Sequence, residues 1–111
     1  MINDFEINAN IEEAETLPAT FYQSQEVFDL IRERVFVRSW HWLGMEKDLL
    51  PFSESVFPLT LFDGYLDEPI VLVKNAQDEI ITLSNVCTHR ANIVVEHAGR
   101  QKQLACMYHG R

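Results

Sequence analysis

The amino-acid sequence predicts a mainly β fold with one helix near its N-terminus. Apolar residues recur at helical spacing between residues 24 and 38, and short runs rich in β-branched residues, separated by turn residues, follow from residue 56 onward. A chain of 111 residues, 47% of them hydrophobic, has room for one domain that buries roughly two-thirds of its unfolded surface. We therefore expect one folded, soluble domain built on antiparallel strands.

The chain begins with a polar arm and a helix. Residues 1–20 end near Leu17-Pro18 and hold too few apolar side chains to pack on their own. Ser24 is a good helix N-cap, and the helix is expected to run to about Arg38 and to pack on a sheet. Its apolar face consists of residues at helical spacing, namely Val27, Phe28, Ile31 and Val35.

Short strands are expected after the helix. Large residues alternate over residues 40–45, as they do in a strand, and Pro51 ends that pattern. Further strands are predicted at about 56–62, 69–74 and 80–84, with a hairpin turn at 75–78 between the last two. Two more, at 93–95 and 103–106, are separated by a turn at Gly99. Two histidines, His41 and His97, are interpreted as a structural and a surface residue.

Two short loops hold both cysteines and two of the four histidines, in the runs Cys87-Thr88-His89 and Cys106-Met107-Tyr108-His109. Taken singly, such residues are usually small buried hydrophobes and satisfied polar groups. Together they form a four-ligand set, which suits either a structural zinc or a two-iron, two-sulfide cluster with histidines on one iron. Zinc sites usually pair cysteine with cysteine and histidine with histidine, whereas each loop here carries one of each. This order favours a binuclear centre with the cysteines on the inner iron and the histidines on the outer one.

Charge and composition limit the other functions. The formal net charge is -8, and residues 1–33 hold eight acids against Arg32 alone. Residues 87–111 are locally basic, with Arg90, Arg100, Lys102 and Arg111 against Glu96. This rim could steer an acidic electron donor, although a solvated face is the commoner meaning of such residues. No basic stripe with interleaved aromatics indicates nucleic-acid binding.

The sequence predicts no membrane contact. It contains neither a run of 18 apolar residues nor a basic or apolar leader, so no membrane span, secretory signal or transit peptide is expected. A cytoplasmic location follows as the default, with both cysteines as reduced thiols.

The chain resembles the N-terminal part of the α subunit of Rieske non-haem iron oxygenases, the aromatic-ring hydroxylating dioxygenases and the related demethylases and quaternary-amine monooxygenases. The resemblance covers about residues 20–111 and rests on the ligand loops and on two longer runs, Arg38-Ser39-Trp40-His41-Trp42-Leu43-Gly44 and Leu83-Ser84-Asn85-Val86-Cys87-Thr88-His89-Arg90. It divides the chain into a polar arm at 1–20, a helix and strand at 21–46, and an incomplete Rieske domain at 47–111. The family commonly has glycine where Ala91 stands, and ring-hydroxylating members often have tryptophan where Arg111 stands. Respiratory Rieske proteins carry extra cysteines at the positions of Asn92 and Tyr108, so that branch is not expected.

The resemblance implies a Rieske-type antiparallel β-sandwich that stops after the second ligand loop. It also implies that Cys87, His89, Cys106 and His109 hold a Rieske [2Fe-2S] cluster. In this family a ferredoxin or flavin reductase supplies the electron, and the cluster relays it to a mononuclear Fe(II) that activates O2 for hydroxylation or demethylation. That iron belongs to a catalytic domain for which this chain has no candidate residues, so the chain alone is not expected to oxygenate a substrate. Full-length members are oligomers, expected to be trimers.

Further expectations concern exposure, potential and assembly. His89 and His109 are expected to be partly exposed, with a cluster potential of roughly -150 to +300 mV that depends on pH. The segment 103–109 is expected to be an open edge that pairs with other chains or leaves the site distorted or empty. Two alternatives stay open, a zinc-stabilised binding module with the same four ligands and a stand-alone Rieske ferredoxin.

Overall fold

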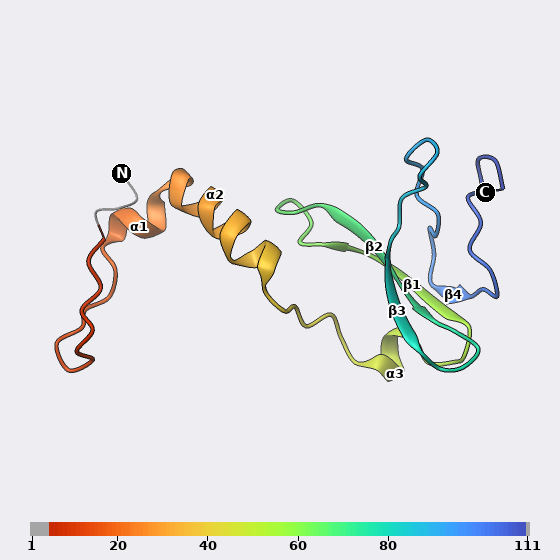
Figure 1. Cartoon of the computed structure of the whole chain (residues 1–111), viewed down its shortest axis with the longest axis horizontal. Helices are drawn as coiled ribbons and strands as arrows, with labels where there is room; N and C mark the ends of the chain where they lie inside the picture. Colours follow the sequence, from red (N-terminus) through yellow and green to blue (C-terminus); the bar gives the residue numbers. More distant parts are fainter. Residues whose placement is uncertain (1–4, 111) are drawn as a thin grey trace. The chain divides into compact units, whose positions relative to one another are not determined.

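The computed structural model describes residues 5–110, and Arg111, which the sequence placed in the basic rim, lies outside them (Figure 1). The chain consists of two compact units, residues 1–41 and residues 42–111. Among the described residues, no helix is long and apolar enough to cross a membrane.

The first unit contains the predicted helix. Two helices, α1 (Ala19–Gln23) and α2 (Gln25–Arg34), are followed by a 3₁₀ turn, η2 (Phe36–Arg38). The N-cap prediction is confirmed, because the Ser24 hydroxyl accepts a hydrogen bond from the Val27 N–H at 3.3 Å. The α-helix ends at Arg34 rather than near Arg38, and its last turn continues as η2. Its packing on a sheet remains a prediction.

The strand predicted at residues 40–45 is wrong. That segment has no regular secondary structure, and Trp40 and Trp42 are fully or largely exposed. Alternating large residues form a strand only where a neighbouring strand takes up their backbone hydrogen bonds. A short helix, α3 (Glu46–Leu49), follows instead. Its Glu46 carboxylate accepts a hydrogen bond from the Lys74 ammonium at 2.8 Å, which raises the pKa of Lys74.

The second unit is built on one antiparallel sheet with the strand order β3-β2-β1-β4 (Figure 1). Its strands are β1 (Ser55–Leu61), β2 (Glu68–Lys74), β3 (Ile80–Ser84) and β4 (Gly99–Arg100). The first three confirm the prediction, as does the hairpin turn between β2 and β3, where the Asn75 Oδ1 accepts the N–H groups of Gln77 and Glu79. The mainly β fold class is therefore confirmed.

The short strands predicted at 93–95 and 103–106 are wrong. Residues 93–95 make one isolated bridge, between Val86 and Ile93, and one further backbone bond, from the Val94 N–H to the Asn85 carbonyl, and 103–106 have no strand pairing. The strand β4 lies at Gly99, where a turn was predicted, and pairs with β1. The segment 93–106 nevertheless packs on the sheet. Val95 is buried with Val56 and Val71, and Val94 and Leu104 lie against this cluster.

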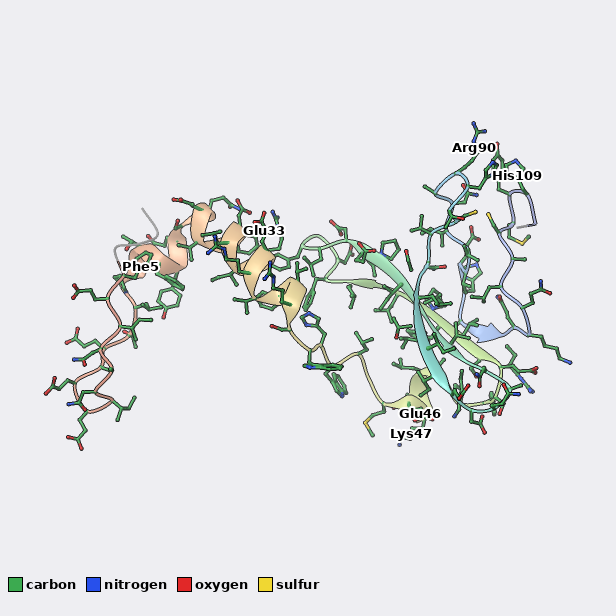
Figure 2. All side chains as sticks on the ribbon, in the orientation of Figure 1. Phe5, Glu33, Glu46, Lys47, Arg90 and His109 are labelled. Carbon is green, nitrogen blue, oxygen red and sulfur yellow. The ribbon has the colours of Figure 1, made fainter. Side chains whose placement is uncertain are left out.

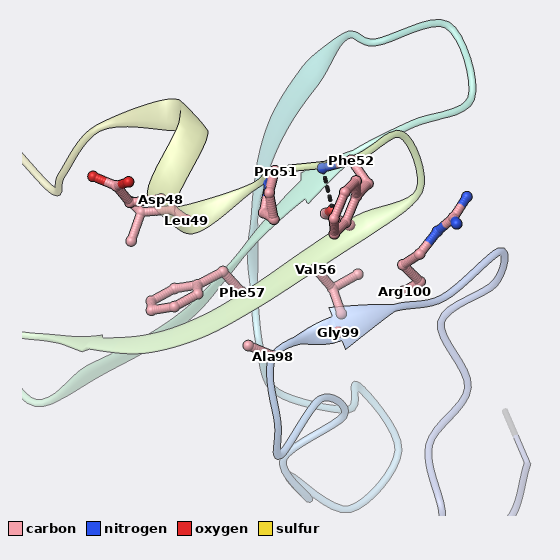
Figure 3. Close-up of a pocket in the computed structure, with 10 residues that line it drawn as sticks. Asp48, Leu49, Pro51, Phe52, Val56, Phe57, Ala98, Gly99 and Arg100 are labelled. Carbon is pink, nitrogen blue, oxygen red and sulfur yellow. Dashed lines mark hydrogen bonds between the residues drawn. The ribbon is translucent and has the colours of Figure 1, made fainter.

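A pocket of about 280 Å³ lies between α3, β1 and β4, and Figure 3 shows its lining. Val56 and Gly99 lie between the Asp48 carboxylate and the Arg100 guanidinium, which lie on opposite sides of the view. None of the four predicted ligands is among its lining residues, so it is separate from the ligand loops.

Candidate metal centre

The first ligand loop leaves the sheet directly at the end of β3. The Cys87 N–H donates to the Asn92 carbonyl at 2.7 Å, and the Ala91 N–H donates to the Cys87 carbonyl at 2.9 Å. These two bonds close a tight loop over residues 87–92. Because β3 is hydrogen-bonded along its length to β2, the loop is attached to a rigid element.

The second ligand loop repeats this geometry. The Gly110 N–H donates to the Cys106 carbonyl at 2.7 Å, so each cysteine carbonyl accepts the N–H four residues further on. The donating residue is left-handed in both loops, with φ of 57° at Ala91 and 71° at Gly110. The loops therefore share a fold, although the histidine follows its cysteine by two residues in one and by three in the other.

The two loops bring their histidines together. The Nδ1 atoms of His89 and His109 lie 3.2 Å apart, and the rings are edge-on to one another. Two nitrogens bound to one metal ion at about 2.1 Å in a tetrahedral arrangement lie about 3.4 Å apart, so the observed separation fits a shared ion. Figure 2 shows His109 and Arg90 at the end of the unit that carries both loops.

The cysteines and histidines differ in burial. Cys106 is only 2% exposed and Cys87 is half-buried, whereas both histidines are exposed. The two cysteines are not joined in a disulfide. Within residues 5–110, no three histidine, cysteine or acidic side chains are grouped closely enough to hold one metal ion. The donor set thus runs from buried sulfur to exposed nitrogen, which fits a binuclear group with an inner and an outer metal.

The remaining histidines lie elsewhere. The His41 Nε2 is 2.6 Å from the Phe36 carbonyl in the first unit, in agreement with a structural role. His97 is exposed and lies outside both ligand loops. Nothing in the sequence singled out Asn85, which precedes the first ligand loop. Asn85 is 2% exposed and bonds to the Val95 backbone, a contact that no spacing in the sequence indicates.

Replacing Ala91 with glycine is expected to stabilise the chain by roughly 1 kcal/mol. Ala91 holds a left-handed backbone, which costs a non-glycine residue about 1–2 kcal/mol, partly offset by the entropy that glycine loses on folding. Urea unfolding of A91G measures the change. Ala98→Gly is the matched control, since Ala98 is also exposed but is not among the described residues with positive φ, and it is expected to destabilise. Equal destabilisation by both substitutions would contradict the assignment of strain to Ala91.

A buried and a half-buried thiol with two exposed imidazoles on two matched loops are a donor set that suits an iron-sulfur domain. A model of the Rieske [2Fe-2S] domain family matches residues 39–111. The chain belongs to this family, and its cofactor class is therefore the Rieske [2Fe-2S] cluster rather than a structural zinc.

Similar proteins are oxygenase subunits. The chain is 32% identical over 102 residues to the carnitine monooxygenase oxygenase subunit of Escherichia coli (strain K12), covering 91% of this chain and 26% of that one. It is 33% identical over 110 residues to the benzene 1,2-dioxygenase subunit alpha of Pseudomonas putida, covering 97% and 23%. A crystal structure of a quaternary ammonium Rieske monooxygenase with L-carnitine superposes with a TM-score of 0.73 at 26% identity, covering 87% and 26%. The chain thus spans about a quarter of the length of these relatives.

Proposed function

We propose that Cys87, His89, Cys106 and His109 hold a Rieske [2Fe-2S] cluster that carries single electrons within an oxygenase α subunit. The cysteines would bind the inner iron and the histidines, through Nδ1, the outer one. The observation that carries this proposal is the 3.2 Å approach of the His89 and His109 Nδ1 atoms across two loops of the same geometry.

The proposed ligands differ in burial, and this difference gives the cysteines and the histidines different roles. The buried Cys106 and half-buried Cys87 keep the sulfur ligands away from water, which preserves thiolate–iron bonding. Because the two Nδ1 atoms face each other, the Nε2 atoms of the exposed rings lie on the outer side. An Nε2–H there can donate a hydrogen bond to a carboxylate of a neighbouring domain. The histidines are thus the exit route for the electron, and the cluster, when bound, supplies the one-electron chemistry.

The electron donor is proposed to be a ferredoxin or a flavin reductase. Arg90 is exposed in the first ligand loop, whereas Arg100 lies on β4 in the pocket apart from the loops, 3.9 Å from the Glu54 carboxylate. A basic residue at the loop attracts an acidic protein and speeds encounter at low ionic strength.

The acceptor is proposed to be a mononuclear Fe(II) in a catalytic domain of the same kind of subunit. Inter-subunit electron transfer is reported for the quaternary ammonium Rieske monooxygenase. We propose the same route in an oligomer, expected to be a trimer, with O2-dependent hydroxylation or demethylation as the reaction it serves. The cytoplasmic location stays a prediction.

A redox titration of the reconstituted chain tests this function. We expect a one-electron transition between roughly -150 and +300 mV, the range of clusters with two histidine ligands. The potential should fall as the pH rises from neutral to alkaline, because bound imidazoles release protons more readily when the iron is oxidised. A potential near -400 mV that does not change with pH would contradict ligation by His89 and His109.

A further inference from the structure

We propose that Asn85 is the positioning residue that fixes the first ligand loop, and with it Cys87, against the sheet. This inference rests on the proposed function, since it concerns the same cluster. It assigns a role to a residue that is not itself a ligand.

Asn85 is the only residue of the loop region whose side chain replaces a strand partner, among the hydrogen bonds described for residues 85–110. Its Oδ1 accepts the Val95 N–H at 2.8 Å, and its Nδ2 donates to the Val95 carbonyl at 2.7 Å. The backbone N–H and carbonyl of Val95 are therefore both bonded to the Asn85 side-chain amide. Asn85 is 2% exposed, so these bonds are shielded from water and costly to leave unmade.

The backbone of Asn85 is bonded as well. Its N–H donates to the Pro69 carbonyl of β2 at 2.9 Å, and its carbonyl accepts the Val94 N–H at 3.2 Å. The side chain and the backbone together link three segments, namely β2, the end of β3 and the return segment after the loop. A residue with this number of buried bonds holds a single conformation.

The register explains why an asparagine stands here. The loop closes with Cys87 bonded to Asn92 and Val86 bridged to Ile93, and Asn85 bonded to Val94 continues the same ladder. One further step would pair Val95 with Ser84. Instead the Asn85 amide takes both Val95 groups, and the Val95 side chain is buried against Val56 and Val71. The amide thus ends the ladder and directs the return segment onto the face of the sheet.

Cys87 lies two residues beyond this point, and its backbone position follows from the same ladder. Groups that orient metal ligands without touching the metal typically change metal affinity 10- to 100-fold when they are removed. Asn85→Asp keeps the shape of the side chain but replaces the Nδ2 donor with a second acceptor facing the Val95 carbonyl. We expect N85D to lose its cluster to a chelator at least about 10-fold faster than the wild type.

Two variants separate positioning from general stability. Val71→Ala removes two core methyl groups from β2 and destabilises the same unit; it loosens the packing around Val95 but removes no hydrogen bond of the loop. Asn75→Asp makes the same chemical change in the hairpin turn, where the half-buried Asn75 accepts the Gln77 and Glu79 N–H groups through Oδ1 and donates to the Glu79 carboxylate at 2.8 Å through Nδ2. If Asn85 positions the cluster, N85D alone should shift the reduction potential and the electron paramagnetic resonance g-values. An N85D cluster with the potential, the g-values and the chelator resistance of V71A would overturn the proposal.

Amide hydrogen exchange on the cluster-free chain tests the positioning role of Asn85 separately from the proposal that the chain binds a cluster. In N85D the exchange rates of the Cys87 and Val95 amides should rise relative to those of the β1–β2 pairs, whether or not the wild type retains a cluster. A wild-type chain without a cluster would count against the proposed function, whereas unchanged relative exchange at Cys87 in N85D would overturn the role of Asn85.

Discussion

The Cys106→Ser variant is expected to bind no cluster. Cys106 is one of only two cysteines in the chain and is 2% exposed at the start of the second loop. Serine preserves the size and the buried position, but its hydroxyl is a hard, protonated group at neutral pH, whereas the inner iron of a Rieske cluster is held by two thiolates. The Cys106 carbonyl also accepts the Gly110 N–H, so the backbone of the loop is expected to survive the substitution.

Iron and labile sulfide content after anaerobic reconstitution measures this effect. C106S should hold neither, and its far-ultraviolet circular dichroism should match that of the cluster-free wild type. Ala105→Ser is the matched control, because it adds a hydroxyl at the neighbouring exposed position without removing a ligand, and it should retain full iron and sulfide. Two irons and two sulfides in C106S would exclude Cys106 as a ligand.

Converting both histidines to cysteine is expected to lower the reduction potential by hundreds of millivolts. The double variant His89→Cys/His109→Cys replaces two neutral imidazoles with two thiolates, so the bound group gains two negative charges. Clusters with four cysteines have potentials near -400 mV, compared with roughly -150 to +300 mV for clusters with two histidines. The 3.2 Å separation of the Nδ1 atoms shows that both positions face one point, although the shorter cysteine side chain requires the loops to close slightly.

Potentiometric titration between neutral and alkaline pH detects this change. The double variant should titrate near -400 mV with a potential independent of pH, because no ligand imidazole remains to release a proton. His97→Cys introduces the same residue at an exposed position outside the loops and should leave both properties unchanged. If the double variant kept the wild-type potential and pH dependence, His89 and His109 would not be the ligands.

Much of the fold could be predicted from local sequence signals. The Ser24 cap, the helical spacing after it and the strands on either side of the Asn75 turn are each determined by residues close in sequence. The pairing of the two ligand loops could also be predicted, because a cysteine and a histidine in each loop is a rare combination. The structure adds their common closing hydrogen bond and left-handed residue.

The errors arose where the structure depends on contacts distant in sequence. The segment 40–45 has the alternation of a strand but no strand to pair with, so it has no regular structure. The backbone ladder ends at Val94 and the Asn85 side chain holds Val95 instead, so residues 93–95 are not a strand although Val95 is buried. A hydrophobic pattern reports burial more reliably than it reports how the backbone is bonded.

The sequence predicted that residues 103–109 form an open edge, but it did not indicate that part of this segment packs on the sheet. The structure places Val94, Val95 and Leu104 against the sheet, so part of the segment is supported by core packing, while β3 and β4 form the two edges of the sheet. Pairing of this segment with other chains stays a prediction.

The central claim is that these four residues hold a two-iron, two-sulfide cluster, and the iron, zinc and labile sulfide content of the purified chain tests it most directly. After anaerobic reconstitution we expect two irons and two sulfides per chain and a red-brown absorption that bleaches with dithionite. A colourless chain that binds one zinc ion and no sulfide under the same conditions would contradict the account.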